Sequence, residues 1–136
     1  MNQKLWQILP DNPTDGNNCP YGSISAFGNN PLLISLDFLI RDGWLSSEDI
    51  RNYPKSNSNK ISFKDINSIR NSLLSKSVDN FLKNITDNQS TDFKKFCKKN
   101  KYWLDDFALF NVLQEVLNEE QWIKWPSDYK LLNKNH

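Results

Sequence analysis

Residues 62–85 read SFKDINSIRNSLLSKSVDNFLKNI, and their apolar positions recur every three or four residues. This spacing predicts an amphipathic helix with one buried face. Ser62 followed by Asp65 is typical of a helix N-terminus. The predicted buried face consists of Ile66, Ile69, Leu73, Leu74, Val78, Phe81, Leu82 and Ile85.

Other helices are predicted on both sides of this one. After a break at 86–90, helices are expected at 91–99, with Asn100 as its C-cap, and from about 104 to 118. Before it, a start or turn at Asn30-Pro31 leads to a helix at 35–42 that Gly43 ends. Ser46 and Asp49 predict one more short helix. The chain is therefore expected to be mostly α-helical.

The composition fits one globular domain and excludes several function classes. The 136 residues carry 17 Lys plus Arg and 16 Asp plus Glu, a balance that gives no electrostatic basis for binding nucleic acid or an anionic membrane. The aromatic share of 12% is too high for a disordered chain. No apolar run approaches the roughly 20 residues of a membrane helix, and the start lacks the apolar core of a secretory signal.

Histidine and cysteine usage narrows the chemistry. Cys19 and Cys97 are too few for a disulfide scaffold, which indicates reduced thiols and a cytoplasmic location. The only histidine is the final residue, His136, so a histidine-based catalytic or zinc site is disfavoured. No C-x-x-C, Walker or G-x-G-x-x-G motif occurs. No metal site and no cofactor are expected.

The N-terminal part combines a short apolar run with a polar loop. Leu5–Leu9, closed by Pro10, predicts one short buried strand of the parallel type. Residues 11–22, rich in Asp, Asn, Pro and Gly, predict a long loop. Such a loop can present side chains to a ligand or serve as a plain connection. Tyr21, preceded by Pro20, offers a phenol that could bond to or stack on a ligand, although the residues alone favour a structural role.

Other residues with catalytic or binding potential are better explained by structure. Adjacent helical residues diverge by about 100°, so Asp105 and Asp106 cannot easily flank one bond. They are expected to stabilise a helix N-terminus. Trp122 and Trp125 could stack on sugar rings, but packing is favoured, and Cys97 is expected to be a small core residue.

Several separate motifs, in order over nearly the whole chain, resemble one family. They are Trp6-Gln-Ile-Leu-Pro10, Pro13-Thr14, Pro20-Tyr21, Ser23-Ile-Ser-Ala-Phe27, Asn30-Pro-Leu-Leu-Ile-Ser-Leu36, Phe96-Cys97, Trp103-Leu-Asp-Asp-Phe-Ala-Leu-Phe110 and Trp122-x-x-Trp125-Pro126. The pattern is similar to that of the amylomaltases, which are 4-alpha-glucanotransferases or disproportionating enzymes.

The resemblance implies an α/β fold, a (β/α)8 barrel, and retaining transfer of α-1,4-glucan segments between malto-oligosaccharides. One carboxylate acts as the nucleophile and a second as general acid and base. The family's catalytic carboxylates lie downstream of the matched motifs, and a barrel takes about 250 residues. The chain is therefore expected to be a barrel fragment, with one short barrel strand and a long loop, that holds no catalytic residue and is inactive alone.

The resemblance also assigns binding residues. Tyr21 matches a tyrosine that contacts the sugar, and Cys19 replaces a serine that lines the site, which weakens that contact. Gly16 stands where the family often has a second tyrosine, so that contact is expected to be lost. Ser23 and Ser25 also match, but they are interpreted first as loop structure.

The resemblance to the amylomaltases also suggests how the chain is organised. Residues 1–53 are expected to hold the barrel strand, the substrate-side loop and the following helices, with a linker at 54–60 and a helical insertion subdomain at 61–136. Two alternatives to an inactive fragment remain open. One is a non-catalytic glucan-binding or helical interaction module. The other is one part of a split enzyme that a complementing chain completes.

Overall fold

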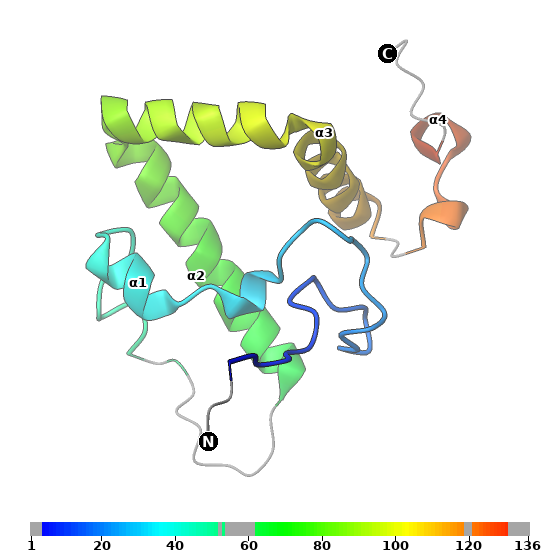
Figure 1. Ribbon diagram of the computed structural model, residues 1–136, viewed down its shortest axis with the longest axis horizontal. Helices are drawn as coiled ribbons and strands as arrows, with labels where there is room; N and C mark the ends of the chain where they lie inside the picture. Colours follow the sequence, from blue (N-terminus) through cyan, green and yellow to red (C-terminus); the bar gives the residue numbers. More distant parts are fainter. Residues whose placement is uncertain (1–3, 52, 54–61, 119–120, 131–136) are drawn as a thin grey trace. The chain divides into compact units, whose positions relative to one another are not determined.

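The computed structural model describes residues 4–51, 53, 62–118 and 121–130, and its contacts form two compact units, Met1–Thr91 and Asp92–His136. The first unit contains the 3-10 helix η1 (Pro31–Leu33), α1 (Leu36–Arg41) and α2 (Phe63–Asn84). Helix α3 (Asp87–Leu117) begins in the first unit and continues into the second, followed by η2 (Trp122–Lys124) and α4 (Ser127–Lys130). Figure 1 shows these elements along the chain.

Helix α2 confirms the prediction made from residues 62–85. Ser62 is its N-cap residue, and the Ser62 hydroxyl donates to the Asp65 carboxylate at 2.6 Å. Leu73 is buried on the predicted apolar face. Val78 and Leu82, from the same pattern, are more than half exposed. The described part of the first unit therefore covers only part of the apolar face of α2.

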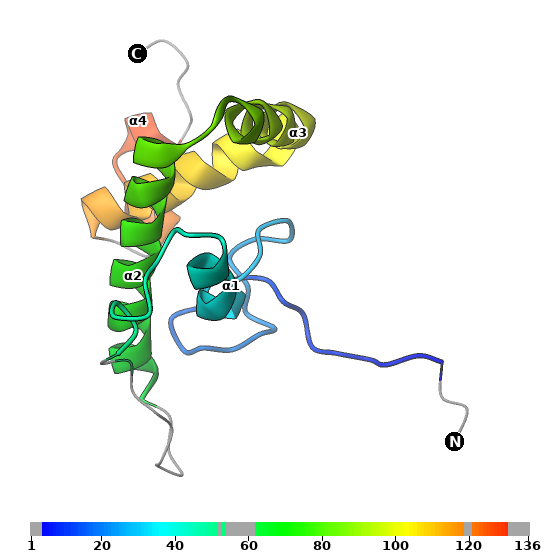
Figure 2. The same cartoon turned by 90° about the vertical axis from the view of Figure 1, so that its left-hand side faces the viewer.

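The core of the first unit lies where α1 packs against α2, as Figure 2 shows. Leu36 of α1, Leu45 of the following turn and Leu73 of α2 are at most 9% exposed. Burying one such side chain contributes about 1.5–3 kcal/mol. Five partly buried side chains surround this cluster: Leu39, Ile40, Ile50, Tyr53 and Ile69.

Helix α1 begins and ends as predicted. The Ser35 hydroxyl accepts a hydrogen bond from the Phe38 amide at 3.4 Å, and Gly43 has a φ of 81° just after the helix. Glycine adopts this left-handed conformation more easily than other residues, and the conformation ends the helix. The chain then contacts α2, where Asn80 Nδ2 donates to the Trp44 carbonyl at 2.9 Å.

The short helix expected at Ser46 is wrong, although its capping box forms. The Ser46 amide donates to the Asp49 carboxylate at 2.9 Å, and the Asp49 amide donates to the Ser46 hydroxyl at 3.3 Å. The residues that follow form turns. A single closed turn is a costly nucleus that needs further helical residues, and the sequence reaches Pro54 too soon to supply them.

Asp49 makes this turn sensitive to acid. Its carboxylate pairs with Lys76 of α2, and hydrogen bonds from Lys76 and Ser46 lower the pKa of Asp49 from its usual 3.8 to about 2. The folded state therefore favours the ionised carboxylate. This stabilisation is present above the unfolded pKa of about 4 and is lost as the pH falls towards 2.

We expect Asp49→Asn to lower the melting temperature at pH 7, whereas at pH 2 the difference should nearly vanish, because Asp49 is then protonated in the unfolded state and about half protonated in the folded state. Thermal unfolding at the two pH values tests this. Glu48→Gln is the matched control, because Glu48 and Arg51 form an exposed pair that contributes little. An equal deficit of Asp49→Asn at both pH values would contradict the electrostatic explanation.

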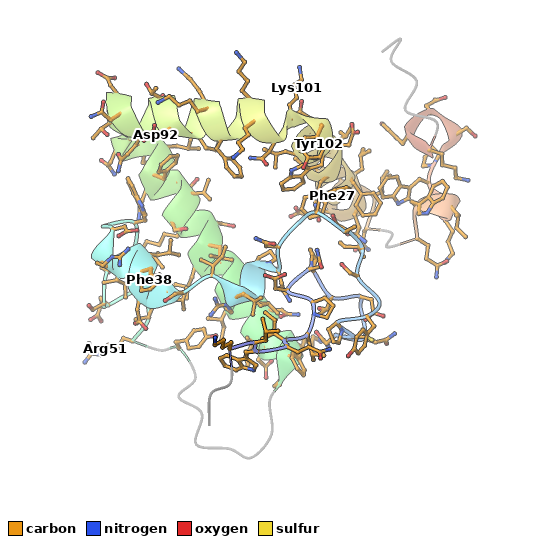
Figure 3. All side chains as sticks on the ribbon, viewed as in Figure 1. Phe27, Phe38, Arg51, Asp92, Lys101 and Tyr102 are labelled. Atoms are coloured by element: carbon orange, nitrogen blue, oxygen red, sulfur yellow. The ribbon has the colours of Figure 1, made fainter. Side chains whose placement is uncertain are left out.

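The two helices predicted at 91–99 and 104–118 are one helix, α3. In place of the predicted break at 86–90, Thr86 and Gln89 form a capping box at the N-terminus of α3. The Gln89 amide donates to the Thr86 hydroxyl at 3.3 Å. Asn100 lies inside the helix, and its side chain donates to the Phe96 carbonyl at 2.9 Å. Figure 3 shows α3 changing direction near the labelled Lys101 and Tyr102.

The continuity of α3 changes the interpretation of the acidic pair. Asp105 and Asp106 are exposed in the C-terminal half of the helix, far in sequence from its start at Asp87. Their predicted role at a helix N-terminus is therefore wrong. The predicted end near 118 is confirmed, since α3 ends at Leu117 and Asn118 has a φ of 49°.

The two tryptophans of the C-terminal motif, Trp122 and Trp125, have different environments. Trp125 is 5% exposed, and its ring lies 5.2 Å from the Phe110 ring of α3. Packing is therefore confirmed for Trp125. Trp122, by contrast, is 54% exposed.

The predicted linker at 54–60 lies outside the described residues.

The short strand expected at Leu5–Leu9 is not confirmed. Among the described residues no strand occurs, and Leu5 and Trp6 are more than 90% exposed. A parallel strand needs partners and covering helices, and the described chain offers this segment neither. Among the described residues, no helix is both long enough and apolar enough to span a membrane.

Candidate functional site

The loop predicted at 11–22 is part of a longer segment, 11–30, that two hydrogen bonds close at its base. The Asn30 amide donates to the Asp11 carbonyl at 2.8 Å, and Asn12 Nδ2 donates to the Gly28 carbonyl at 3.1 Å. Residues 11–30 therefore form a closed excursion from the helical part of the first unit. Its C-terminal base continues directly into η1, where the Asn30 side chain accepts a bond from the Leu32 amide at 2.9 Å.

Asp15 organises the centre of this loop. Its carboxylate accepts hydrogen bonds from the amides of Asn17 and Cys19, both at 2.9 Å, and its carbonyl accepts one from the Asn18 amide. Asn18 has a φ of 60°, a left-handed conformation that asparagine tolerates. The Gly22 amide donates to the Cys19 carbonyl at 3.2 Å, which closes the next turn. The composition of residues 11–22 predicted the loop but not this role of Asp15.

Tyr21 lies in the turn that these bonds fix. Its side chain is 75% exposed, so the phenol is available to a ligand. Cys19, two residues earlier, is half-buried with a free thiol. Its amide is already committed to Asp15. The turn thus presents an aromatic face and one strong hydroxyl donor at Tyr21, while Cys19 offers only a weak sulfur donor beside it.

Ser23 and Ser25 support the loop itself, as expected. The Ser23 hydroxyl donates to the Ser25 carbonyl at 2.7 Å. The Ser25 hydroxyl accepts from the amides of Phe27 and Gly28 at 3.1 and 2.9 Å. These bonds confirm the structural interpretation of both serines. Phe27 is 59% exposed on the same excursion.

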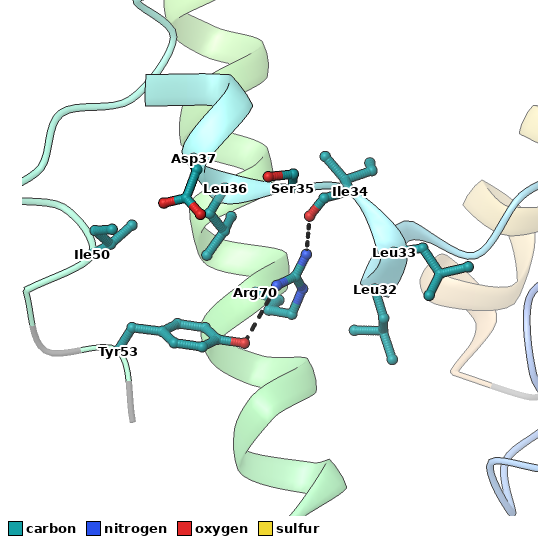
Figure 4. A pocket seen from close by; sticks show the side chains of 9 residues that line it. All are labelled: Leu32, Leu33, Ile34, Ser35, Leu36, Asp37, Ile50, Tyr53 and Arg70. Atoms are coloured by element: carbon teal, nitrogen blue, oxygen red, sulfur yellow. Dashed lines mark hydrogen bonds between the residues drawn. The ribbon is translucent and has the colours of Figure 1, made fainter. Parts of the chain in front are cut away.

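A pocket of about 560 Å³ lies at the base of this excursion, within the first unit. Arg70 of α2 crosses it, donating to the Tyr53 hydroxyl at 3.4 Å and to the Ile34 carbonyl, as Figure 4 shows. Arg70 Nε is buried and has no partner among the described residues. The rest of the lining is mostly apolar: Leu32, Leu33, Ile34, Ser35, Leu36, Asp37 and Ile50. The sequence patterns did not predict this pocket or the position of Arg70 in it.

The described residues do not assemble an acid pair or a metal centre around Tyr21. Asp15 is occupied with backbone amides, and Asp105 and Asp106 belong to the second unit. No group of three or more His, Cys, Asp or Glu residues suited to a metal ion occurs in the described ranges. The arrangement is suited to binding a neutral polar ligand by stacking and hydrogen bonding.

We expect Gly22→Ala to loosen the turn that carries Tyr21. A Cβ at residue 22 would lie 2.9 Å from Asp15 Cγ and closer still to one carboxylate oxygen, so the Asp15 side chain must move. Losing a hydrogen bond worth about 1 kcal/mol speeds local opening roughly fivefold. Hydrogen exchange at the Asn17 and Cys19 amides measures this change.

Asp15→Ala is the matched control for this prediction, because it removes the same acceptor without adding a Cβ at residue 22. Both variants should speed exchange at the same two amides. Unchanged exchange in Gly22→Ala would mean that the Asp15 carboxylate keeps its bonds in a shifted position.

Comparisons with known proteins agree on one family. A family model described as 4-alpha-glucanotransferase matches residues 1–136. A 4-alpha-glucanotransferase of Clostridium butyricum is 38% identical over 131 residues, which are 95% of this chain and 26% of that protein. One from Synechocystis sp. is 33% identical over 126 residues, 93% of this chain and 25% of that protein.

A solved structure gives the same result. Amylomaltase from Streptococcus agalactiae, in complex with acarbose, is similar with a TM-score of 0.80 and 31% identity. The match covers 93% of this chain and 25% of that one. The chain thus spans about a quarter of the length of the relatives it matches.

Proposed function

Because the chain belongs to the 4-alpha-glucanotransferase family, we propose that it forms the part of a glucanotransferase that carries a substrate-binding loop. The whole enzyme transfers α-1,4-glucan segments between malto-oligosaccharides by a retaining double displacement. The observation that carries the proposal is the exposed Tyr21 on a turn fixed by Asp15, within a chain that the family model matches throughout.

Tyr21 is the proposed sugar contact. Its ring can lie against the C–H face of a glucose unit, and its hydroxyl can exchange hydrogen bonds with sugar hydroxyls. The fixed turn supports this role, because a side chain held in place loses less freedom on binding. Cys19 is a weaker contact beside it, since a thiol is a poor hydrogen-bond partner.

The 136-residue chain by itself is proposed to be inactive. Retaining transfer needs a nucleophilic carboxylate about 5–5.5 Å from an acid–base carboxylate, and a (β/α)8 barrel takes about 250 residues. This chain corresponds to about a quarter of its relatives' length. The remaining barrel, with the catalytic carboxylates, is proposed to come from a complementing polypeptide segment.

The organisation and location are also proposals. Residues 1–53 form the strand-and-loop part and 61–136 the helical insertion, joined by 54–60. The strand at 5–9 would form when the rest of the sheet is present. The two free thiols, Cys19 and Cys97, support a cytoplasmic location.

A disproportionation assay tests the proposed function. The purified chain is incubated with maltotriose, alone and together with a polypeptide that supplies the remaining three quarters of a related enzyme. We expect glucose and longer oligomers only from the mixture. Redistribution of maltotriose by the chain alone would contradict the proposal, as would a mixture that stays inactive when both parts are folded and associated.

The role of Tyr21 is tested in the active mixture. We expect Tyr21→Ala to lower kcat/KM by about tenfold, the effect of losing about 1.4 kcal/mol of binding. Tyr21→Phe keeps the ring and should lose less. Phe27→Ala, which removes another exposed ring of the same excursion, is the matched control. Equal losses in the Tyr21→Ala and Phe27→Ala variants would mean that Tyr21 has no special contact.

A further inference from the structure

Two consecutive turns lead to Tyr21, and the Asp15 side chain joins them. The first turn closes where the Asn18 amide donates to the Asp15 carbonyl at 2.9 Å. The second closes where the Gly22 amide donates to the Cys19 carbonyl at 3.2 Å, and Tyr21 is its third residue. Oδ1 of the Asp15 carboxylate accepts the Cys19 amide at 2.9 Å. One side chain therefore holds the start of the second turn to the first turn.

The other oxygen of this carboxylate faces the end of the second turn. A Cβ built on Gly22 would lie 2.4 Å from Asp15 Oδ2, so the carboxylate occupies the space beside the Gly22 backbone. Between the two ends, the ring of Pro20 fixes φ at about −65°, the angle that the second residue of a common turn requires. Asp15 thus contacts both ends of the turn from which the Tyr21 side chain projects, 75% exposed.

Building on the proposed function, we infer that Asp15 is a positioning residue for glucan binding. It holds the turn at 19–22 closed, so that the Tyr21 ring is in place before the sugar arrives. A ring held in advance loses less conformational freedom on binding than a ring on an open loop. Asp15 acts through the backbone, because its Oδ1 is occupied by the amides of Asn17 and Cys19.

The geometry also predicts which property of Asp15 matters. Both hydrogen bonds from the loop amides end on Oδ1, which is an acceptor that a carboxamide supplies equally. In Asp15→Asn the carbonyl oxygen can take the Oδ1 position, and the NH₂ group can take the Oδ2 position beside Gly22. Asparagine should therefore replace Asp15, and alanine should not. A direct, charged contact with the sugar would require the carboxylate itself.

Kinetics of the active mixture in the maltotriose assay test this inference. We expect Asp15→Ala to lower kcat/KM about fivefold, the effect of losing one hydrogen bond from the turn, and Asp15→Asn to lower it less than about twofold. In a Tyr21→Ala background, Asp15→Ala should lower kcat/KM by less than about twofold more, because Asp15 acts through the Tyr21 ring. A general loss of structure would not depend on Tyr21 in this way.

Asp11→Ala is the matched control. It removes an exposed carboxylate from the base of the same excursion and keeps the Asp11 carbonyl that accepts the Asn30 amide. Its kcat/KM should stay within about twofold of the unsubstituted protein, the range for a surface change that breaks no hydrogen bond. Far-ultraviolet circular dichroism checks that each variant is folded.

Fluorine NMR of the 136-residue chain labelled with 3-fluorotyrosine measures the positioning without an activity assay. Tyr21→Phe and Tyr53→Phe assign two of the signals. We expect Asp15→Ala to narrow the Tyr21 signal, because the ring gains motion when the turn opens, and to leave the Tyr53 signal unchanged. Asp15→Asn should keep the Tyr21 signal broad. A Tyr21 signal that Asp15→Ala does not narrow would overturn the inference.

The kinetic outcomes separate this inference from the proposed function. An active mixture that Asp15→Ala does not impair overturns the inference and leaves the proposed function standing. The inference is also overturned if Asp15→Asn loses as much activity as Asp15→Ala, or if Asp15→Ala has its full effect without the Tyr21 ring. A mixture that stays inactive overturns the proposed function, and the inference with it, whatever the fluorine signals show.

Discussion

Replacing Trp125 with alanine is expected to lower the free energy of unfolding of the second unit by about 3–5 kcal/mol, the cost of truncating a large buried aromatic. Trp125 is the buried hydrophobic residue of that unit among the described residues, and it packs on Phe110 of α3. Because native domains are stable by only about 5–15 kcal/mol, this loss should detach the η2 turn from α3.

Urea unfolding followed by circular dichroism measures this loss, and hydrogen exchange at Lys124 and Trp125 reports detachment of the turn. Trp122→Ala removes the same side chain from an exposed site three residues earlier, so it is the matched control and should change stability by less than about 1 kcal/mol. Equal destabilisation by the two variants would mean that Trp125 does not anchor the turn.

Replacing Leu73 with alanine is expected to lower the free energy of unfolding of the first unit by about 2–4 kcal/mol. Leu73 is 8% exposed and joins Leu36 of α1 to Leu45 of the following turn. Deleting its side chain removes buried apolar surface and leaves a cavity. The loss should also free the segment at 44–53, which carries Asp49 and Tyr53 to α2.

The control for Leu73 is Leu82→Ala on the same helix. Leu82 is 61% exposed, so its truncation should cost less than about 1 kcal/mol, while the change in helix propensity is the same. Urea unfolding of both variants gives the comparison. A Leu73→Ala protein as stable as Leu82→Ala would show that the cluster around α1 contributes little to the unit.

Local patterns predicted the elements whose determinants are close in sequence. The periodicity of 62–85 gave α2, and Ser35 with Gly43 gave both ends of α1. The predictions of helix boundaries were wrong where one residue type favours two different local structures. Asn100 looked like a C-cap, but its side chain bonds to the Phe96 carbonyl within a continuing helix. Thr86 and Gln89 looked like a break and instead cap that helix.

The candidate site was predictable only in part, because some of its contacts join residues that meet only after folding. Turn-forming residues located the loop, and the resemblance singled out Tyr21, whose side chain is exposed. The role of Asp15 depends on which of several carboxylates and amides meet after folding, which composition does not specify. The Arg70 pocket joins residues 36 positions apart, and no local pattern encodes such a pairing.

The exposed run at Leu5–Leu9 bears on how the chain behaves in a cell. Unpaired backbone groups flanked by bulky apolar side chains are a template for intermolecular β-association. The 136-residue chain produced alone should therefore precipitate at high concentration. In a cell it should be bound by chaperones and cleaved by proteases. Docking of this run into a completed barrel would remove that liability, so assembly itself would act as quality control.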